Sequence, residues 1–212
     1  MKEFVEKLFS LNDDKEAEEL VQDVETNNEK AFFDGVLEII IVSDNHRAKR
    51  GLTKVLEYHD RADRFLHCGD SNLEPSDEVM KHFVTVRGNT DYLQGYQEDE
   101  FIDLASDERI WITHGHRYSV NSGTRDLVKS AKAGRRGAEV PPVDIVVYGH
   151  THRVDVKMQE GVLVINPGSI SRPRDGPYRT YARLLITNDF YDVQILDISD
   201  HSVIKEFQFP RE

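Results

Sequence analysis

The sequence predicts an α/β fold in which two mixed sheets pack face to face between outer helices, and three observations support it. Short apolar runs alternate with helical patterns from residue 36 to about residue 90, an order typical of βαβ units. Later apolar runs are joined by tight turns such as Glu160-Gly161 and Asn188-Asp189, which favour antiparallel strands. A chain of 212 residues with 38% apolar residues is long enough to bury such a core.

Residues 1–34 differ from the rest of the chain. They hold eleven acidic and four basic residues, so they carry −7 of the net charge of −12. Apolar side chains recur there at helical spacing, at Phe4, Val5, Leu8 and Phe9 and then at Ala17, Leu20, Val21 and Val24. We predict an acidic helical extension that packs on the domain or on another copy, with a regulatory or partner-binding arm as the alternative. Asp34-Gly35 marks the boundary with the main domain, residues 35–212.

The main domain begins with a predicted buried strand, because residues 36–43 are apolar except for Glu38 and the final serine. Its first half continues with a helix near 47–59, a strand at 64–68, a short helix at 77–82 and a strand at 83–87. An antiparallel pair at 100–104 and 109–113, a helix at 124–136 and a strand at 144–148 follow. The last predicted strands are 153–159, 162–166, 181–187, 191–198 and 203–209.

Composition excludes several classes of protein. The single cysteine, Cys68, rules out an internal disulfide framework and is typical of a reducing compartment. No apolar stretch is long enough to cross a bilayer, and the acidic N-terminus is not a secretory signal. The net charge of −12 argues against non-specific binding to nucleic acid or to anionic membranes. We therefore predict a cytoplasmic protein that binds neither a membrane nor nucleic acid.

Side chains that can bind a metal follow five of the predicted strands. In chain order they are Asp44 and His46, then Asp70, then Asn89, then His114, and finally His150 and His152. Glycine stands beside four of these five positions, where it lets the backbone turn sharply or approach a ligand closely. Because strand ends form the ligand-binding crevice of an open α/β sheet, we expect these side chains to gather at one edge.

Seven candidate ligands are too many for one tetrahedral zinc ion, but they suit two ions that share a bridging carboxylate. A donor set of imidazole, carboxylate and amide without a thiolate favours Mn, Fe, Zn, Ni or Co over Ca or Mg. The spacing Asp44-x-His46 and His150-x-His152 places two side chains on the same side of an extended backbone. Each pair could therefore bind one ion or lie between both.

Together, Asp44-x-His46, Gly69-Asp70, Gly88-Asn89, His114-Gly115-His116 and Gly149-His150-Thr151-His152 resemble the five motifs of the calcineurin-like metallophosphoesterase superfamily. The similarity is greatest to its YfcE-type bacterial and archaeal phosphodiesterases, extends from about Val36 to Phe209, and includes residues 166–169 and 171–176. It implies a four-layer α/β/β/α sandwich. It also implies a first metal held by Asp44, His46, Asp70 and His152, and a second held by Asp70, Asn89, His114 and His150, with Asp70 bridging.

The resemblance further implies an enzyme, a dinuclear phosphodiesterase in which a metal-bound hydroxide attacks the phosphorus of a small phosphodiester substrate. Asp70, Asn89 and His150 are the predicted catalytic residues, and Asn89 and Arg174 are predicted to bind substrate. We expect two divalent transition-metal ions, manganese first, with zinc, iron, nickel or cobalt as alternatives. A non-catalytic protein-interaction scaffold of the same fold, and a phosphomonoesterase or nucleotide pyrophosphatase, stay open as alternatives. The sequence also leaves homo-oligomerisation open.

Thr90 stands where much of the superfamily has a histidine that assists the leaving group. Threonine cannot supply a proton at neutral pH as imidazole can, so we expect a preference for diesters with good leaving groups. We place His116 beside the ligands and consider Asp91 a candidate acceptor for one of the ligand histidines. Three other histidines lie outside every motif and are expected in solvent, namely His59, His82 and His201.

Overall fold

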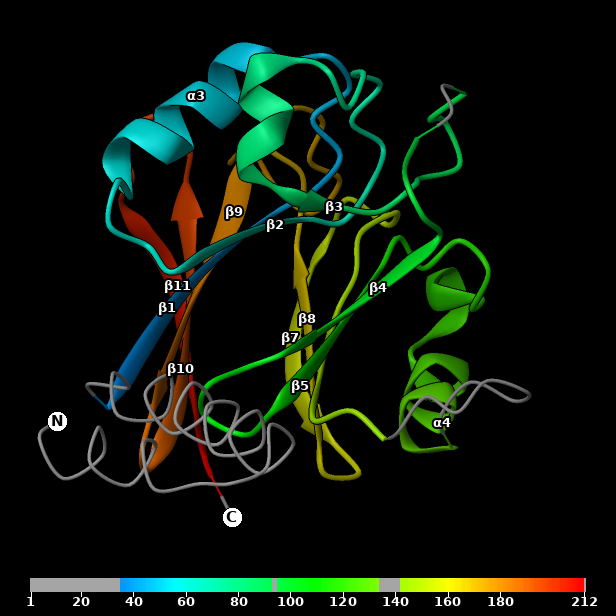
Figure 1. Cartoon of the computed structure of the whole chain (residues 1–212), viewed down its shortest axis with the longest axis vertical. Helices are drawn as coiled ribbons and strands as arrows, with labels where there is room; N and C mark the ends of the chain where they lie inside the picture. The colour runs from blue at the N-terminus through cyan, green and yellow to red at the C-terminus, as the bar shows by residue number, and fades with distance from the viewer. Residues whose placement is uncertain (1–34, 93–94, 134–141, 212) are drawn as a thin grey trace, which may run out of the picture. The chain divides into compact units, whose positions relative to one another are not determined.

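The computed structural model of the chain describes residues 35–92, 95–133 and 142–211 (Figure 1). The helical extension predicted over residues 1–34 lies outside the described residues, as do the last three residues of the helix predicted over 124–136. Within the described ranges, no helix is both long enough and apolar enough to cross a membrane.

The described strands form two mixed sheets. The first has the order β11-β10-β9-β1-β2-β3 and consists of β1 (Val36–Val42), β2 (Arg64–His67), β3 (Val84–Thr85), β9 (Thr180–Thr187), β10 (Phe190–Asp197) and β11 (Val203–Pro210). The second has the order β4-β5-β6-β8-β7 and consists of β4 (Asp99–Asp103), β5 (Arg109–Thr113), β6 (Ile145–Val147), β7 (Val154–Gln159) and β8 (Val162–Pro167). Every strand predicted from the sequence is confirmed, with its ends moved by at most two residues.

In the described part of the chain the helices are fewer than the strands. The two α-helices of the described chain are α3 (Lys49–Tyr58) and α4 (Arg125–Ala133), both predicted from apolar periodicity. The short helix predicted over 77–82 is a 3₁₀ helix, η1 (Glu78–His82). A second 3₁₀ turn, η2 (Val120–Ser122), has no periodic signal in the sequence.

Three apolar clusters hold the layers together, and β1 shows how. Successive side chains of a strand point to opposite faces, so Ile39 and Ile41 join the cluster between the two sheets while Ile40 and Val42 face α3. On the outer face of the second sheet, Leu127 of α4 packs in a third cluster. Figure 1 shows the two sheets facing each other between α3 and α4. The predicted four-layer α/β/β/α sandwich is confirmed.

Parallel pairing brings the strand ends together. In the first sheet β1 pairs with β2 and β2 with β3 in parallel, and in the second β5 pairs with β6 and β6 with β8 in parallel. The carboxyl ends of each parallel group therefore lie at one edge of its sheet. Hydrogen bonds from the amide of Asp44 to the carbonyl of Gly69, and from the amide of Gly149 to the carbonyl of His114, tie neighbouring ends together.

The expectation that His59 lies in solvent is wrong. Its side chain is buried where α3 ends against the first sheet, with Nδ1 3.0 Å from Glu38 Oε1 and Nε2 2.9 Å from the hydroxyl of Tyr181. Glu38, the polar break in the apolar run of β1, also accepts a hydrogen bond from Arg183 Nε at 2.7 Å. Of the other two histidines, His82 is exposed as expected and His201 is half-buried.

Candidate metal centre

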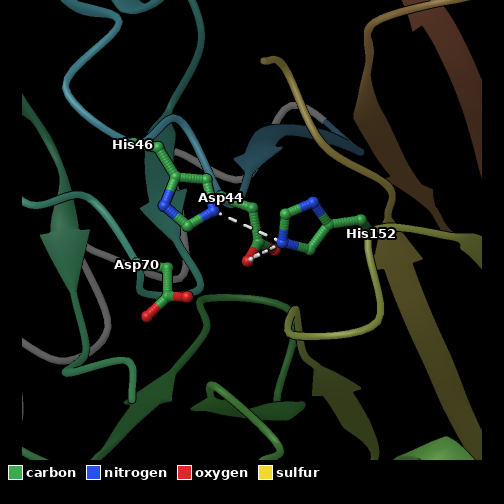
Figure 2. A group of neighbouring side chains, drawn as sticks. All are labelled: Asp44, His46, Asp70 and His152. Carbon is green, nitrogen blue, oxygen red and sulfur yellow. Dashed lines mark hydrogen bonds and ion pairs between the residues drawn. The ribbon is translucent and has the colours of Figure 1, made fainter. Parts of the chain in front are cut away.

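Four predicted ligands lie together where β1, β2 and β6 end. Figure 2 shows Asp44, His46, Asp70 and His152 facing one common space, and one ligand atom from each lies within 4.8 Å of the others. His152 Nε2 is 3.1 Å from Asp44 Oδ1 and 3.3 Å from His46 Nε2. Two carboxylates and two imidazoles at this spacing fit a divalent transition metal.

Hydrogen bonds fix how three of the histidines face the site. His152 Nδ1 lies 2.7 Å from the carbonyl oxygen of Arg172, and His114 Nδ1 lies 2.7 Å from that of Cys68. A carbonyl oxygen only accepts, so Nδ1 carries the hydrogen in both rings and Nε2 presents its lone pair. His46 Nδ1 is held in the same way, 3.0 Å from a side-chain amide oxygen. These rings are oriented as metal ligands.

Asp44 supplies a second sign that a cation belongs here. Its side chain is fully buried, and in the described part of the chain Oδ1 has no hydrogen-bond donor unless His152 Nε2, 3.1 Å away, is protonated. Oδ2 accepts hydrogen bonds from the hydroxyl of Ser43 at 2.6 Å and from the amide of His150 at 3.1 Å. A buried carboxylate oxygen without a partner is costly, and a metal ion bound between Asp44 and His152 would satisfy it.

The remaining predicted ligands form a second group beside the first. His114 Nε2 lies 3.1 Å from Asn89 Oδ1 and 3.5 Å from Asp70 Oδ1, and His150 Nδ1 lies 2.8 Å from Asn89 Oδ1. Asp70 is thus adjacent to both groups. The structure brings all seven predicted side chains to one edge of the sandwich; their roles as ligands stay predictions.

The backbone at this edge is strained. Five of the seven predicted ligands adopt the left-handed region, with φ values between 43° and 68°, at Asp44, His46, Asp70, His150 and His152. Each such residue other than glycine costs of order 1–3 kcal/mol, and this strain persists where surrounding contacts enforce it, typically at functional sites. Here the strand ends turn sharply so that their side chains meet.

Two glycines permit the close approach of the loops. A Cβ atom at Gly88 would lie 2.1 Å from Asp70 Oδ1, and one at Gly149 would lie 2.0 Å from Ser43 Oγ and 2.9 Å from Asp44 Oδ2. No larger residue fits at either position without moving a carboxylate of the site. This explains why glycine precedes Asn89 and His150 in the motifs.

Opposite charges stabilise each other inside the site. Burial opposes ionisation of Asp70, but His114 and the amide of Thr90, 2.8 Å from Oδ1, lower the pKa of Asp70 well below its usual range. Burial likewise opposes protonation of His114, yet Asp70 and Asp44 raise the pKa of His114. The acids of this edge therefore attract positive charge, which a proton or a metal ion can supply.

Three other residues singled out from the sequence, Arg174, His116 and Asp91, lie near the predicted ligands. Arg174 is exposed, donates its amide to the carbonyl of His152 at 2.9 Å, and is close enough for its charge to oppose protonation of that histidine. The ring of His116 lies 5.4 Å from that of His114 between centroids, at the wall of the site. The hypothesis that Asp91 orients a ligand histidine is wrong. Its buried carboxylate instead accepts hydrogen bonds from the backbone amides of Gly88 and Asn72.

Sequence reasoning missed the side chains that hold the ligands. Asn72 accepts from His46 Nδ1, and Asn121 Nδ2 lies 3.1 Å from His150 Nε2. Both lie outside the motifs, and no local signal marks them. The hydroxyls of Ser169 and Ser171 donate to the carbonyl of Asp44 at 2.8 and 2.7 Å. These serines fall within the family-like segments, which were the only signal that could have found them.

Comparisons with known proteins agree with this site. Residues 37–189 match the calcineurin-like phosphoesterase superfamily domain. Over 168 residues the chain is 30% identical to the probable metallophosphoesterase YsnB of Bacillus subtilis (strain 168), covering 79% of this chain and 95% of that protein. Over 144 residues it is 26% identical to the phosphodiesterase YfcE of Escherichia coli (strain K12), covering 63% and 66% respectively.

A solved structure shows that the chain also has the fold of a phosphoesterase. The crystal structure of a predicted phosphoesterase from Streptococcus pneumoniae TIGR4 superposes with a TM-score of 0.74 at 29% identity, over 83% of this chain and 98% of that one. The predicted resemblance to the superfamily and to its YfcE-type members is confirmed. The chain belongs to the calcineurin-like phosphoesterase superfamily, and it is a metal-dependent phosphoesterase.

Proposed function

We propose that this phosphoesterase hydrolyses small phosphate diesters at a centre that holds two metal ions. The observation that carries the proposal is the division of seven donor groups into two adjoining sets around Asp70. A single ion bound by Asp44, His46, Asp70 and His152 would leave Asn89, His114 and His150 with no metal to bind. The naming of the relative YfcE as a phosphodiesterase supports a diester as substrate.

The donor set fits divalent transition metals, and we propose manganese first, with zinc, iron, nickel or cobalt as alternatives. Two such ions, when bound, neutralise charge on a phosphoryl group and make hydroxide available near neutral pH. The protein's part is to hold the ligands rigidly. The carbonyls of Cys68 and Arg172 fix two imidazoles, and the glycines beside the carboxylates allow the loops to close on each other.

Asn89 and Arg174 are the proposed substrate-binding residues. Asn89 Oδ1 faces His114 and His150, so the amide NH₂ points elsewhere and can donate a hydrogen bond to a phosphate oxygen. Arg174 is exposed next to His152, where its guanidinium can meet the negative charge of a substrate. Asn89, Asp70 and His150 remain the proposed catalytic residues.

Thr90 sets the expected range of substrates. Its amide donates to Asp70 Oδ1 and its hydroxyl contacts Asn72, so the side chain lies at the site without an acidic proton to give. We infer that leaving groups must depart without help from an imidazole at this position. Diesters of good leaving groups are then preferred over alkyl monoesters.

A cytoplasmic location stays a prediction from the cysteine content.

The test uses the full chain, stripped of metal and reloaded with Mn²⁺. We expect two ions per chain by elemental analysis and Mn²⁺-dependent hydrolysis of bis(p-nitrophenyl) phosphate faster than of an alkyl monoester. Asp70→Asn should reduce the diester rate at least about 100-fold, because the shared carboxylate is lost. The matched control is Asp126→Asn, which changes an exposed carboxylate on α4 and should leave the rate unchanged.

Three outcomes contradict the proposal. One ion per chain at full activity argues against a dinuclear centre. Undiminished turnover in Asp70→Asn argues against the bridging role of that residue. A monoester rate equal to or above the diester rate makes the phosphomonoesterase alternative the better description.

A further inference from the structure

A cavity of about 610 Å³ lies beside the first half of α3, and none of the seven predicted metal ligands lines it. Its walls come from three parts of the chain: the start of α3, the loop after β8, and the end of β10. The lining residues the argument needs are Arg50, Gly51, Lys54, Ile170, Arg179 and Ile198. Since side chains from distant segments converge there, the cavity is a product of the fold and not of one loop.

The charge around this cavity is positive. Arg50, Lys54 and Arg179 line it against one acid, Asp197, in a chain whose net charge is −12. Within residues 35–92, 95–133 and 142–211, no acidic side chain pairs with any of these three cations; Lys54 Nζ donates to a backbone carbonyl, that of Ser199, at 3.3 Å. Three cations without acidic partners favour a ligand with at least two negative charges.

The floor of the cavity is apolar. Ile170 and Ile198 are buried beneath it, and a Cβ atom at Gly51 would lie 3.3 Å from Ile170 Cδ1 and 3.9 Å from Ile198 Cγ1. The absence of a side chain at Gly51 thus lets α3 approach Ile170 closely. A volume of this size with an apolar floor and polar groups at the rim is typical of sites for small organic ligands. Inorganic phosphate alone would leave the floor without a partner.

The loop after β8 both lines this cavity and supports the metal centre. Ile170 donates its amide to the carbonyl of Ser43 at 3.4 Å, and its neighbours Ser169 and Ser171 donate to the carbonyl of Asp44. The carbonyl of Arg172 holds His152. A ligand over Ile170 therefore contacts the loop that supports Asp44 and His152, without contact to those two side chains' metal-binding atoms.

We propose that this cavity is a second ligand site, separate from the metal centre, for a small organic phosphate or phosphonate that carries two negative charges. The anionic group meets Arg50, Lys54 and Arg179, and the apolar part rests on Ile170 and Ile198. The site does not depend on the reaction proposed for the metal centre.

The probe for the test is phenylphosphonate, which carries an anionic group and an apolar ring and contains no ester to hydrolyse. The full chain, loaded with Zn²⁺, is titrated while backbone amide NMR signals are followed. We expect saturable shifts at Gly51, Ile198 and Ser199. The double variant R50Q/R179Q should weaken this binding at least about tenfold, which corresponds to about 1.4 kcal/mol. R125Q, on exposed α4, is the matched control and should bind as the wild type does.

The metal centre can also bind a phosphonate, so Asp70→Asn separates the two sites. Shifts at Gly51 and Ile198 that persist in Asp70→Asn support the proposal even if the proposed diesterase activity fails. Shifts confined to the segments after β1, β2 and β6 that vanish in this variant overturn it, as does the absence of any shift at the cavity. Inorganic phosphate that binds the cavity as tightly as phenylphosphonate would overturn the role of the apolar floor.

Discussion

His152 Nε2 lies 3.1 Å from Asp44 Oδ1, and both side chains are buried. His152 Nδ1 donates its hydrogen to the carbonyl of Arg172, so Nε2 of the neutral ring carries only a lone pair. Nε2 and Asp44 Oδ1 then face each other as two acceptors. Burial opposes protonation of His152, but Asp44 outweighs it and raises the pKa of that histidine. The arrangement needs a positive charge between the two residues, either a proton or a metal ion.

Metal should therefore stabilise the fold, and Asp44 should be required for it. With free Mn²⁺ at 100 times its dissociation constant, we expect about 2.7 kcal/mol of added stability in metal-free protein, because the ion binds only the folded site. Thermal unfolding with and without Mn²⁺ measures this. Asp44→Asn should lose at least half of this stabilisation. The control, Asp126→Asn, should keep all of it. Equal stabilisation of wild type and Asp44→Asn would show that the ion binds elsewhere.

Thr90→His should widen the range of substrates. An imidazole beside Asp70 and Asn72 can protonate a poor leaving group, a contribution typically of about 100-fold or more. We expect the rate on alkyl monoesters to rise relative to the rate on aryl diesters, measured as kcat/KM for both. Thr90→Val, which removes the hydroxyl at nearly constant size, is the control and should leave the ratio unchanged. Wild-type rates that are already equal on both substrates contradict this view of Thr90.

His67 should make the fold sensitive to acid. Its side chain is fully buried, Nδ1 accepts from the amide of Gly69 at 3.1 Å, and Nε2 therefore donates to Asn45 Oδ1 at 2.9 Å. Burial lowers the pKa of His67 to about 4 from the usual 6.5, despite the nearby carboxylates. Between these two pKa values the unfolded chain binds the proton and the folded chain does not. Stability is thus full above pH 6.5 and falls as the pH drops through this window.

The expected loss from His67 is about 3 kcal/mol between pH 6.5 and pH 4. Chemical denaturation at a series of pH values measures it. His67→Gln keeps a donor for Asn45 without a titrating group, so its stability should fall by about 3 kcal/mol less over this range. The control, His82→Gln at an exposed position, should follow the wild-type curve. A His67→Gln curve parallel to wild type would refute the prediction.

Alanine at Gly88 or Gly149 should impair the centre. Its Cβ would come within 2.1 Å of an oxygen of Asp70 or within 2.0 Å of Ser43 Oγ, so a loop must move. A displacement of about 1 Å in positioned catalytic groups commonly costs about 100-fold in rate, and we expect losses of this order. Activity and metal content of each variant measure the effect. Gly176→Ala is the control, since no atom lies within 4 Å of its added Cβ; unaltered activity in Gly88→Ala would contradict the argument.

Local patterns in the sequence were enough to predict the strands and the motif positions. Alternation along β1 assigns Ile39 and Ile40 to opposite faces from the sequence alone, because the side-chain period of a strand is two residues. The polar groups that follow these strands, such as Asp44 and His114, could be identified as candidates because parallel strands end at a common edge. The charge, the single cysteine and the family resemblance also needed no coordinates.

Only the tertiary structure decided which side chains support the site and which lie elsewhere. Asn72, in the loop after β2, and Asn121, in η2, orient His46 and His150 from outside the motifs. His59 is buried against Glu38 and Tyr181, which are distant in the chain. The cavity beside α3 likewise exists only because three separate segments converge. Periodicity predicts which face of a helix or strand is buried. These features depend instead on contacts between elements that are distant in the chain, which periodicity does not predict.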